Sequence, residues 1–149
     1  MLEAPKPAWL PLGSLLVREG LLTNAQLEEA LLMQHGSGRR LGELLVEWGW
    51  VSSRSICEAL AEQYEFDFVD LAIEPFDPDV AKRLPEAAAR KHEALPVRRM
   101  ADGRLLVAIA DPTDVGAAEE LRTQLGGAIR LAVADLADLE RAIDAAYSD

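Results

Sequence analysis

The sequence predicts an α+β protein in which a duplicated helical-hairpin subdomain precedes a small mixed sheet with covering helices. Two observations support this fold class. Residues 11–34 align with residues 40–63 at an offset of 29 and are identical at ten of the 24 positions, where average composition gives roughly two. Residues 64–149 instead alternate short strand-like runs with helical patterns, which is typical of a small sheet covered by helices.

The first helix of each copy is indicated by its leucines and by the glycine that follows it. Leu12, Leu15 and Leu16 are spaced so that they lie on one helical face. Gly20 and Gly49 follow the apolar run, where a helix commonly ends at a glycine with positive φ. Each copy is therefore expected to contain a short helix, a glycine stop and a second helix.

The second helix of each copy begins at a capping residue. Thr23 and Gln26 have the spacing of a capping box. In the second copy Ser52 or Ser53 takes the capping position without a Glu or Gln partner. The buried face of these two helices is predicted to contain Leu27, Ala30 and Leu31, and Ile56, Ala59 and Leu60.

The second half of the chain is expected to follow the order β-α-α-β-β-α-β-α. Proline, glycine and aspartate mark most boundaries between its elements. The expected elements are a strand near 66–69, a helical turn over 77–84, a helix over 85–93, strands over 94–99 and 105–110 joined by a turn at Asp102-Gly103, a helix from Thr113 or Asp114 to about 125, a strand over 128–134 and a helix over 136–147.

The domain organisation follows from these patterns. We expect a flexible N-terminus at residues 1–11, the duplicated helical subdomain at residues 12–63, and an α+β subdomain at residues 64–149. The linker is placed at residues 63–67, with no Pro/Gly-rich break between the halves.

Composition excludes several classes of function. The formal net charge of −11 disfavours binding to DNA or RNA, because an acidic chain repels a polyphosphate backbone. The single cysteine, Cys57, forbids an internal disulfide and fits a reducing compartment. The chain has neither a signal-peptide pattern nor an apolar run of the roughly 18 residues that span a bilayer. We therefore expect a cytoplasmic protein with no direct membrane span.

No catalytic or metal-binding constellation is visible. The pattern G-x4-G-K-[ST] is absent, since Gly36-Ser37-Gly38 leads into two arginines rather than a P-loop lysine. His35 and His92 stand apart from any zinc-ligand spacing. We therefore expect that this chain is not an enzyme and holds no metal.

Two repeated features leave alternatives open. Gln34 and Gln63 each continue an apolar helical face, and Gly13 and Gly42 each lie near the start of a helix, where an interior glycine costs about 0.5–1 kcal/mol relative to alanine. One reading is that the glycines permit close helix packing and the glutamines cap neighbouring carbonyls. The other is that backbone and amide face a ligand that enters between the copies.

The repeat resembles a known family. The pattern R-L-G-x-x-L-V-x-x-G-x6-L-x3-L-x2-Q, present twice with the five-residue spacer His35–Arg39, is similar to the MshEN domain that opens type II secretion ATPases (general secretion pathway protein E) and type IV pilus extension ATPases. The stretches DFVDL (67–71), LPEAAARKHEALPVRR (84–99) and LLVAIADPTDV (105–115) continue the similarity. Copy one departs from the pattern at Pro11, which replaces the arginine, and copy two at Ile56, which replaces a leucine.

The resemblance implies a binding site for cyclic di-GMP, because members of the family commonly bind it through the two motifs. An arginine can donate to O6 and N7 of a guanine together, and glycine permits close approach of backbone to phosphate. By resemblance, one half of the ligand would be held by Arg40, Leu41, Gly42, Leu45 and Gln63. The other half would be held by Leu12, Gly13, Leu16 and Gln34. Pro11 removes one guanine contact, which is worth roughly 1–3 kcal/mol.

The resemblance also implies an interaction function. In the secretion ATPases this region docks the motor on the cytoplasmic domain of the inner-membrane L protein of type II systems. We therefore expect a docking and regulatory domain that couples its own ATPase domain, absent from this chain, to protein secretion. ATP and Mg would belong to that domain. Residues 1–63 are the expected contact surface, and the localisation would be cytoplasmic and peripheral on the inner-membrane face. The alternative is a cyclic di-GMP sensor of a pilus or secretion ATPase.

Overall fold

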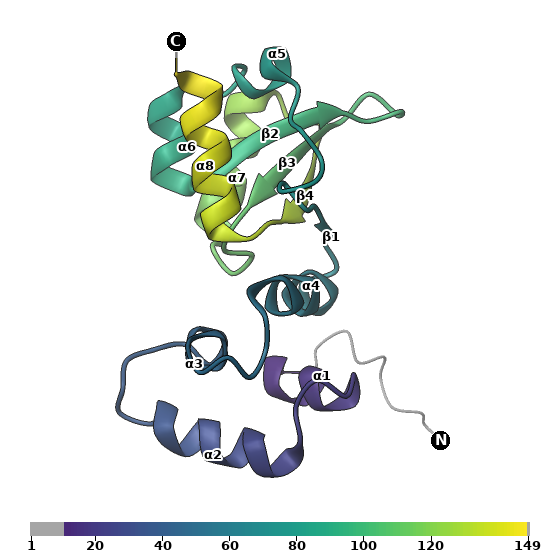
Figure 1. The fold of residues 1–149 in the computed structure, drawn as a ribbon. Helices are drawn as coiled ribbons and strands as arrows, with labels where there is room; N and C mark the ends of the chain where they lie inside the picture. Colours follow the sequence, from purple (N-terminus) through teal and green to yellow (C-terminus); the bar gives the residue numbers. More distant parts are fainter. Residues whose placement is uncertain (1–10, 149) are drawn as a thin grey trace. The chain divides into compact units, whose positions relative to one another are not determined.

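The computed structural model describes residues 11–148 of the chain. Most of the N-terminal stretch expected to be flexible, residues 1–10, lies outside the described residues. The chain forms two compact units, Met1–Glu65 and Phe66–Asp149, which are called the helical unit and the sheet unit below (Figure 1). Each unit is described by itself.

The helical unit contains two copies of one helical hairpin. Its helices are α1 (Leu12–Arg18), α2 (Asn24–Gln34), α3 (Leu41–Glu47) and α4 (Ser53–Tyr64). Adding the sequence offset of 29 to the bounds of α1 and α2 reproduces those of α3 and α4, except that α4 ends one residue later. The structure therefore confirms the predicted duplication.

Both short helices end in the same hydrogen-bonded motif. Gly20 and Gly49 have φ values of +78° and +76°. The amide of Leu21 donates to the carbonyl of Leu16, and the amide of Trp50 donates to that of Leu45, each over 3.0 Å. This pattern is the Schellman motif, which favours glycine because other residues rarely adopt a positive φ.

The second helices begin at the expected caps. Thr23 and Gln26 exchange two hydrogen bonds of 3.0 Å, from each backbone amide to the other side chain, which is the predicted capping box. In the second copy the Ser52 hydroxyl accepts from the amide of Ser55 at 3.0 Å. The structure thus selects Ser52 over Ser53 as the cap.

Apolar side chains from all four helices form the core of the helical unit. Trp48 and Trp50, on either side of the glycine stop, pack against this core with their ring centroids 5.1 Å apart. Its buried members are Leu15, Leu16, Leu22, Ala30, Leu45, Val51, Ile56 and Ala59. Neither hairpin could bury its apolar face alone, so each copy provides the surface against which the other folds.

The sheet unit has a mixed four-stranded sheet with the strand order β1-β4-β3-β2. The strand β4 pairs in parallel with β1 and with β3, whereas β2 and β3 form an antiparallel hairpin. The elements are β1 (Asp67–Phe68), α5 (Pro78–Ala81), α6 (Glu86–His92), β2 (Ala94–Arg99), β3 (Leu105–Ile109), α7 (Val115–Leu125), β4 (Ile129–Val133) and α8 (Leu136–Tyr147). The predicted order and the α+β class are confirmed.

Helices α6 and α8 lie side by side against β2 (Figure 1). The first four residues of β2 and all of β3 are apolar and buried, and Leu95, Val97 and Val107 are fully buried. The Tyr147 hydroxyl at the end of α8 donates to the carbonyl of Leu84 over 2.5 Å. Burial of this hydroxyl raises the pKa of Tyr147 above its ordinary value.

The two-residue strand β1 is joined to β4 by a bidentate ion pair. Arg130 donates to both carboxylate oxygens of Asp67, at 3.2 Å from Nε and 3.0 Å from the terminal nitrogen. The hydrogen bonds from Arg130 hold the pKa of Asp67 below its ordinary value, although burial acts in the opposite direction. A lowered pKa means that the folded state favours the charged carboxylate.

We therefore predict that Arg130→Gln raises the pKa of Asp67 towards its ordinary value, as an NMR titration of the carboxyl carbon would show. The ion pair should stabilise the sheet unit fully above about pH 4, the unfolded pKa, and lose this effect as pH falls through the lower folded pKa. Because both side chains are partly exposed, the stabilisation should remain below about 1 kcal/mol. An unchanged Asp67 titration in the variant would contradict this account.

Candidate functional site

The two motif glycines lie in equivalent surroundings. A Cβ atom added to Gly13 would lie 2.5 Å from Leu27 Cδ1 and 3.3 Å from Leu41 Cδ2. A Cβ atom added to Gly42 would lie 3.1 Å from Ile56 Cγ2 and 3.6 Å from Leu12 Cδ2. Each glycine thus faces one side chain of its own copy and one leucine of the other copy. This favours the close-packing reading of the glycines.

These contacts are reciprocal between the copies. Leu12 of the first copy reaches Gly42, and its equivalent Leu41 of the second copy reaches Gly13. The helix contacts follow the same rule, since α1 packs on α4 and α2 packs on α3. Reciprocal contacts between equivalent positions are the property of a two-fold interface. The helical unit therefore has approximate two-fold symmetry within one chain.

The four motif leucines divide into two pairs. Leu16 and Leu45 have an exposed fraction of 0% and belong to the core of the helical unit. In this conformation they support the site residues and offer no surface to a ligand. Leu12 and Leu41 are half-buried and lie on the glycines of the opposite copy. Only the second pair can contribute apolar contact directly.

The two motif glutamines differ in their surroundings. The Gln34 amide nitrogen donates to the carbonyl of Arg39 over 3.2 Å, which is the capping role considered from the sequence. Gln63 is 7% exposed. Gln34 is only half-buried, so the two glutamines differ in burial.

The starts of α1 and α3 also differ. Arg40 is exposed and precedes α3, and its amide donates to Glu43 Oε1 over 3.1 Å. The equivalent residue before α1 is Pro11, which has no amide hydrogen, and Ser14 occupies the place of Glu43. One end of the site thus carries an arginine with an anchored backbone, and the other carries a proline.

An ion pair connects α1 of the first copy to α4 of the second. Arg18 and Glu62 lie 2.7 Å apart. The pKa of the neighbouring Glu19 is raised above its ordinary value. The main cause is a side-chain hydrogen bond with Glu62, and burial of Glu19 is the second cause. The equivalent positions of the other pair, Glu47 and Met33, cannot form such a pair, so the two halves also differ in charge.

The leucine spacing also identifies a residue that the sequence-based site left out. Leu31 belongs to the L-x3-L-x2-Q part of the pattern and was expected on the buried face of α2. It is 46% exposed, whereas its equivalent Leu60 is partly buried against the core. Leu31 can therefore contribute apolar contact to a ligand on the first-copy side.

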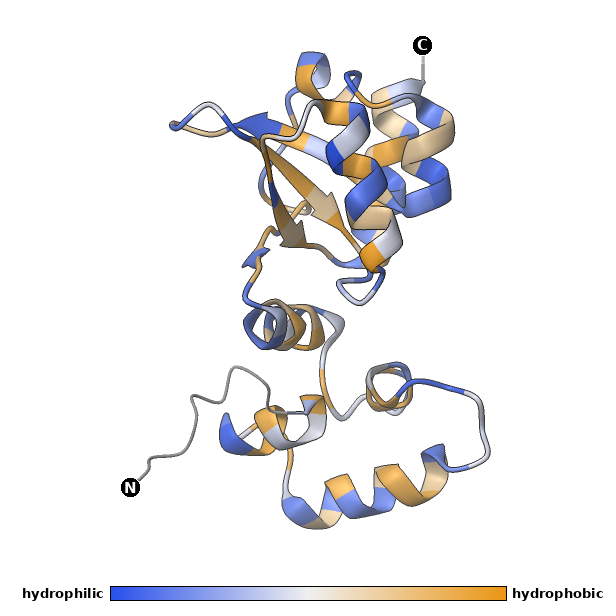
Figure 2. Ribbon diagram, turned by 180° about the vertical axis from the view of Figure 1, so that it is seen from behind, coloured by the Kyte–Doolittle hydropathy of each residue, from blue (hydrophilic) through white to orange (hydrophobic). Residues whose placement is uncertain are grey.

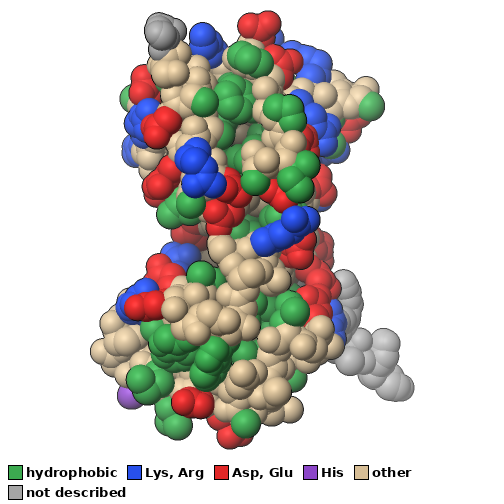
Figure 3. Space-filling model, in the orientation of Figure 1, with side chains coloured by type: hydrophobic (Ala, Val, Ile, Leu, Met, Phe, Trp, Pro, Cys, Tyr) green, Lys and Arg blue, Asp and Glu red, His purple; other side chains and the backbone are tan. Residues whose placement is uncertain are grey.

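Exposed apolar residues continue along α2. Leu31, Leu32 and Met33 are consecutive and all exposed, and Leu32 has the largest exposed fraction of the three, 77%. The hydropathy colouring shows hydrophobic stretches along α2 (Figure 2), and apolar side chains gather on the visible face of the helical unit (Figure 3). Exposed apolar side chains that gather in a patch often mark a binding surface.

The sheet unit contains fewer candidate binding features than the helical unit. An open hollow of about 570 Å³ lies between the loop before α5 and the helix α8, lined by Leu71, Ala72, Pro75, Phe76, Pro78, Asp138, Arg141 and Ala142. Among residues 11–148, no group of three or more His, Cys, Asp or Glu side chains is placed to hold a metal ion. Within the same part of the chain, no helix has the length and apolar character needed to cross a membrane.

Comparison with known proteins identifies a family to which the chain is similar. The MshEN domain family matches residues 63–149. The chain is 34% identical over 138 residues to the type IV pilus assembly ATPase PilB of Myxococcus xanthus (strain DK1622), covering 93% of this chain and 24% of that protein. It therefore spans about a quarter of the length of this PilB relative.

Two solved structures are similar over almost the whole chain. The structure of MshE with cyclic di-GMP has a TM-score of 0.79 and 37% identity, and covers 93% of this chain and 99% of that one. The N-terminal domain of XpsE has a TM-score of 0.65 and 26% identity, and covers 95% and 97% respectively. The family match begins at the last residue of the repeat, and the MshE match extends over the repeat as well. This chain belongs to the MshEN domain family.

Proposed function

We propose that the helical unit binds cyclic di-GMP and that the chain is the regulatory N-terminal domain of a pilus-assembly or secretion ATPase. The reciprocal contact of Leu12 with Gly42 and of Leu41 with Gly13 carries this proposal. It makes two equivalent motif surfaces related by an approximate two-fold axis. Cyclic di-GMP is itself two-fold symmetric, with two guanines and two phosphates, so each motif can receive one half. The similarity to MshE with cyclic di-GMP supports this reading.

The proposed roles follow from burial and position. Arg40 reads the edge of one guanine, and Leu41 and Leu12 contact the ligand rings. Gly13 and Gly42 let the two copies approach each other closely. Leu16 and Leu45 support these surfaces from the core. Gln34 and Gln63 close the two ends of the site, and Leu31 adds apolar contact beside Gln34.

Titration calorimetry with cyclic di-GMP tests this function, and cyclic di-AMP is the matched control. Adenine presents an N6 amino donor where guanine presents the O6 acceptor, so an arginine that reads guanine cannot make the same pair with it. We expect one cyclic di-GMP per chain and at least about tenfold weaker binding of cyclic di-AMP. Absence of heat with cyclic di-GMP would remove the proposed function.

We place ATP and Mg binding in a separate domain of the full-length protein. The similarity to PilB, of which this chain spans 24%, supports a pilus-assembly ATPase as the source of that domain. Binding of cyclic di-GMP to the described residues would then regulate ATP hydrolysis in that separate domain. This assignment of ATP binding to another domain agrees with the lack of a P-loop motif in the given sequence.

Docking to a protein partner is the second candidate function. The exposed apolar residues Leu31, Leu32 and Met33 on α2 favour it, as does the similarity to the XpsE N-terminal domain. The proposed partner is the cytoplasmic domain of an inner-membrane L protein of type II secretion, which would hold the chain at the membrane face.

Analytical ultracentrifugation with a purified L-protein cytoplasmic domain tests the docking proposal. We expect a complex with the unmodified chain and a loss of complex for Leu32→Glu, because a charge would replace an exposed apolar contact. The exposed Ile73→Glu in the sheet unit is the matched control and should leave the complex intact. Equal binding by all three proteins would exclude α2 as the contact.

A further inference from the structure

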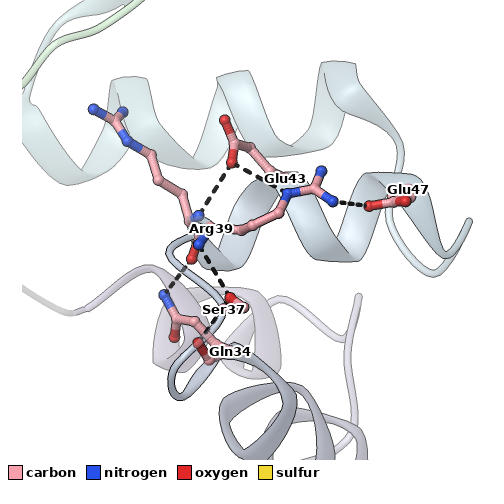
Figure 4. A network of polar contacts seen from close by, with 6 residues as sticks. Gln34, Ser37, Arg39, Glu43 and Glu47 are labelled. Carbon is pink, nitrogen blue, oxygen red and sulfur yellow. Dashed lines mark hydrogen bonds and ion pairs between the residues drawn. The ribbon is translucent and has the colours of Figure 1, made fainter.

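The five-residue spacer His35–Arg39 between the motif copies is held by a connected set of hydrogen bonds. Its glycines, Gly36 and Gly38, have φ values of +80° and +75°. The Ser37 hydroxyl donates to the carbonyl of Gln34 over 2.8 Å and accepts from the amide of Arg39 over 3.0 Å. One serine therefore joins the end of α2 to the end of the spacer (Figure 4).

The side chain of Arg39 attaches the spacer to α3. Its guanidinium lies 2.5 Å from Glu47 and 3.8 Å from Glu43, and Figure 4 shows it extending along α3 towards Glu47. The backbone carbonyl of Arg39 accepts a hydrogen bond from the side-chain amide nitrogen of Gln34 over 3.2 Å. Both the backbone and the side chain of Arg39 are thus engaged within the protein.

These contacts also restrict the backbone of the next residue, Arg40. The Arg39 carbonyl and the Arg40 amide belong to one peptide unit, and both are hydrogen-bonded, the first by Gln34 and the second by Glu43. A spacer with two glycines would otherwise sample many backbone conformations. Fixing this peptide unit limits the directions in which the side chain of Arg40 can leave the backbone.

From Pro11 onward, where the description of the first copy begins, its motif start differs from this arrangement. Pro11 cannot donate an amide hydrogen, and Ser14 replaces the carboxylate of Glu43. The two half-sites therefore differ in the hydrogen bonding of the residue before the helix as well as in their arginine. A preorganised group binds more tightly because less freedom is lost on binding.

We propose that Arg39 is a positioning residue that holds the spacer so that Arg40 is preorganised for the guanine of a cyclic dinucleotide. The inference rests on the proposed function. Arg39 itself makes no ligand contact, because its guanidinium is committed to Glu43 and Glu47 on α3. The half-site at α3 is then the stronger of the two.

Hydrogen exchange and calorimetry on the same variants test this inference. In Arg39→Ala we expect faster amide exchange over residues 36–40 without ligand, and about three- to tenfold weaker binding of cyclic di-GMP. Arg39→Lys keeps a cation opposite Glu47 and should recover most of both effects. Arg54→Ala is the matched control, because it removes another exposed arginine that is ion-paired to a glutamate four residues later, and it should change neither.

The outcomes separate the two proposals. If the unmodified chain binds and Arg39→Ala speeds exchange without weakening binding, the spacer does not position Arg40 and the inference is wrong. If Arg39→Ala weakens binding with unchanged exchange and no recovery in Arg39→Lys, Arg39 is a ligand contact, which also overturns it. If the unmodified chain binds no cyclic di-GMP, the proposed function fails together with any ligand role of Arg39, whatever the exchange of the spacer shows.

Discussion

Truncation of Leu45 to alanine is expected to lower the free energy of unfolding of the helical unit by about 2–5 kcal/mol. Leu45 is fully buried and lies in a core to which both copies contribute. Removing its branched end leaves a cavity that the short helices on either side can only partly fill. Chemical denaturation followed by the fluorescence of Trp48 and Trp50, which pack on this core, measures the loss.

Leu32→Ala is the matched control for this prediction. It deletes the same atoms from a side chain that is 77% exposed, so the expected change is within about 0.5 kcal/mol. Leu16→Ala should resemble Leu45→Ala, because the two leucines are equivalent under the internal symmetry and equally buried. If Leu45→Ala and Leu32→Ala changed the free energy of unfolding equally, the assignment of Leu45 to a core shared by the two copies would be wrong.

Replacing Arg40 with alanine is expected to weaken cyclic di-GMP binding by about 10- to 100-fold. In the proposed site Arg40 supplies the one bidentate guanine contact that the two motifs retain, and such a contact is worth roughly 1–3 kcal/mol. Arg40 is exposed at the start of α3, so the variant should fold normally. Calorimetry measures the affinity, and an unchanged dissociation constant in Arg40→Ala would contradict the assignment of the site.

The converse change supplies a control in the same site. Pro11→Arg restores the motif arginine in the first copy, where the proline has φ −56° and ψ 153°, a conformation open to other residues. We expect about fivefold tighter binding, at the lower end of the range for one guanine contact, because Ser14 cannot hold the arginine backbone as Glu43 does. Adding Ser14→Glu should increase the gain, and Pro11→Ala should produce none.

The helices and their ends could be predicted from the sequence because each is determined by nearby residues. Gly20 and Gly49 ended the short helices through a local positive φ, and Thr23 with Gln26 began α2 through a local capping box. Proline, aspartate and glycine similarly marked the elements of the sheet unit. The remaining ambiguity between Ser52 and Ser53 was also local, and the hydrogen bond to Ser55 resolved it.

The arrangement of the site could not be predicted in the same way. Periodicity within one copy does not say how two copies pack, so the reciprocal contacts at Gly13 and Gly42 required the structure. The same limit explains Leu31, which has the spacing of a buried residue but is left uncovered on α2. The spacer contacts of Arg39 join residues up to eight positions apart, to Glu47, and no single motif encodes them.

Amide chemical shifts of the chain titrated with cyclic di-GMP test the central claim most directly. If two symmetric motifs hold one symmetric ligand, both Gly13 and Gly42 should shift together and saturate at one ligand per chain. Gly103 in the hairpin turn of the sheet unit should stay unchanged. Shifts at only one of the two motif glycines, or shifts confined to residues 66–148, would contradict the two-fold site.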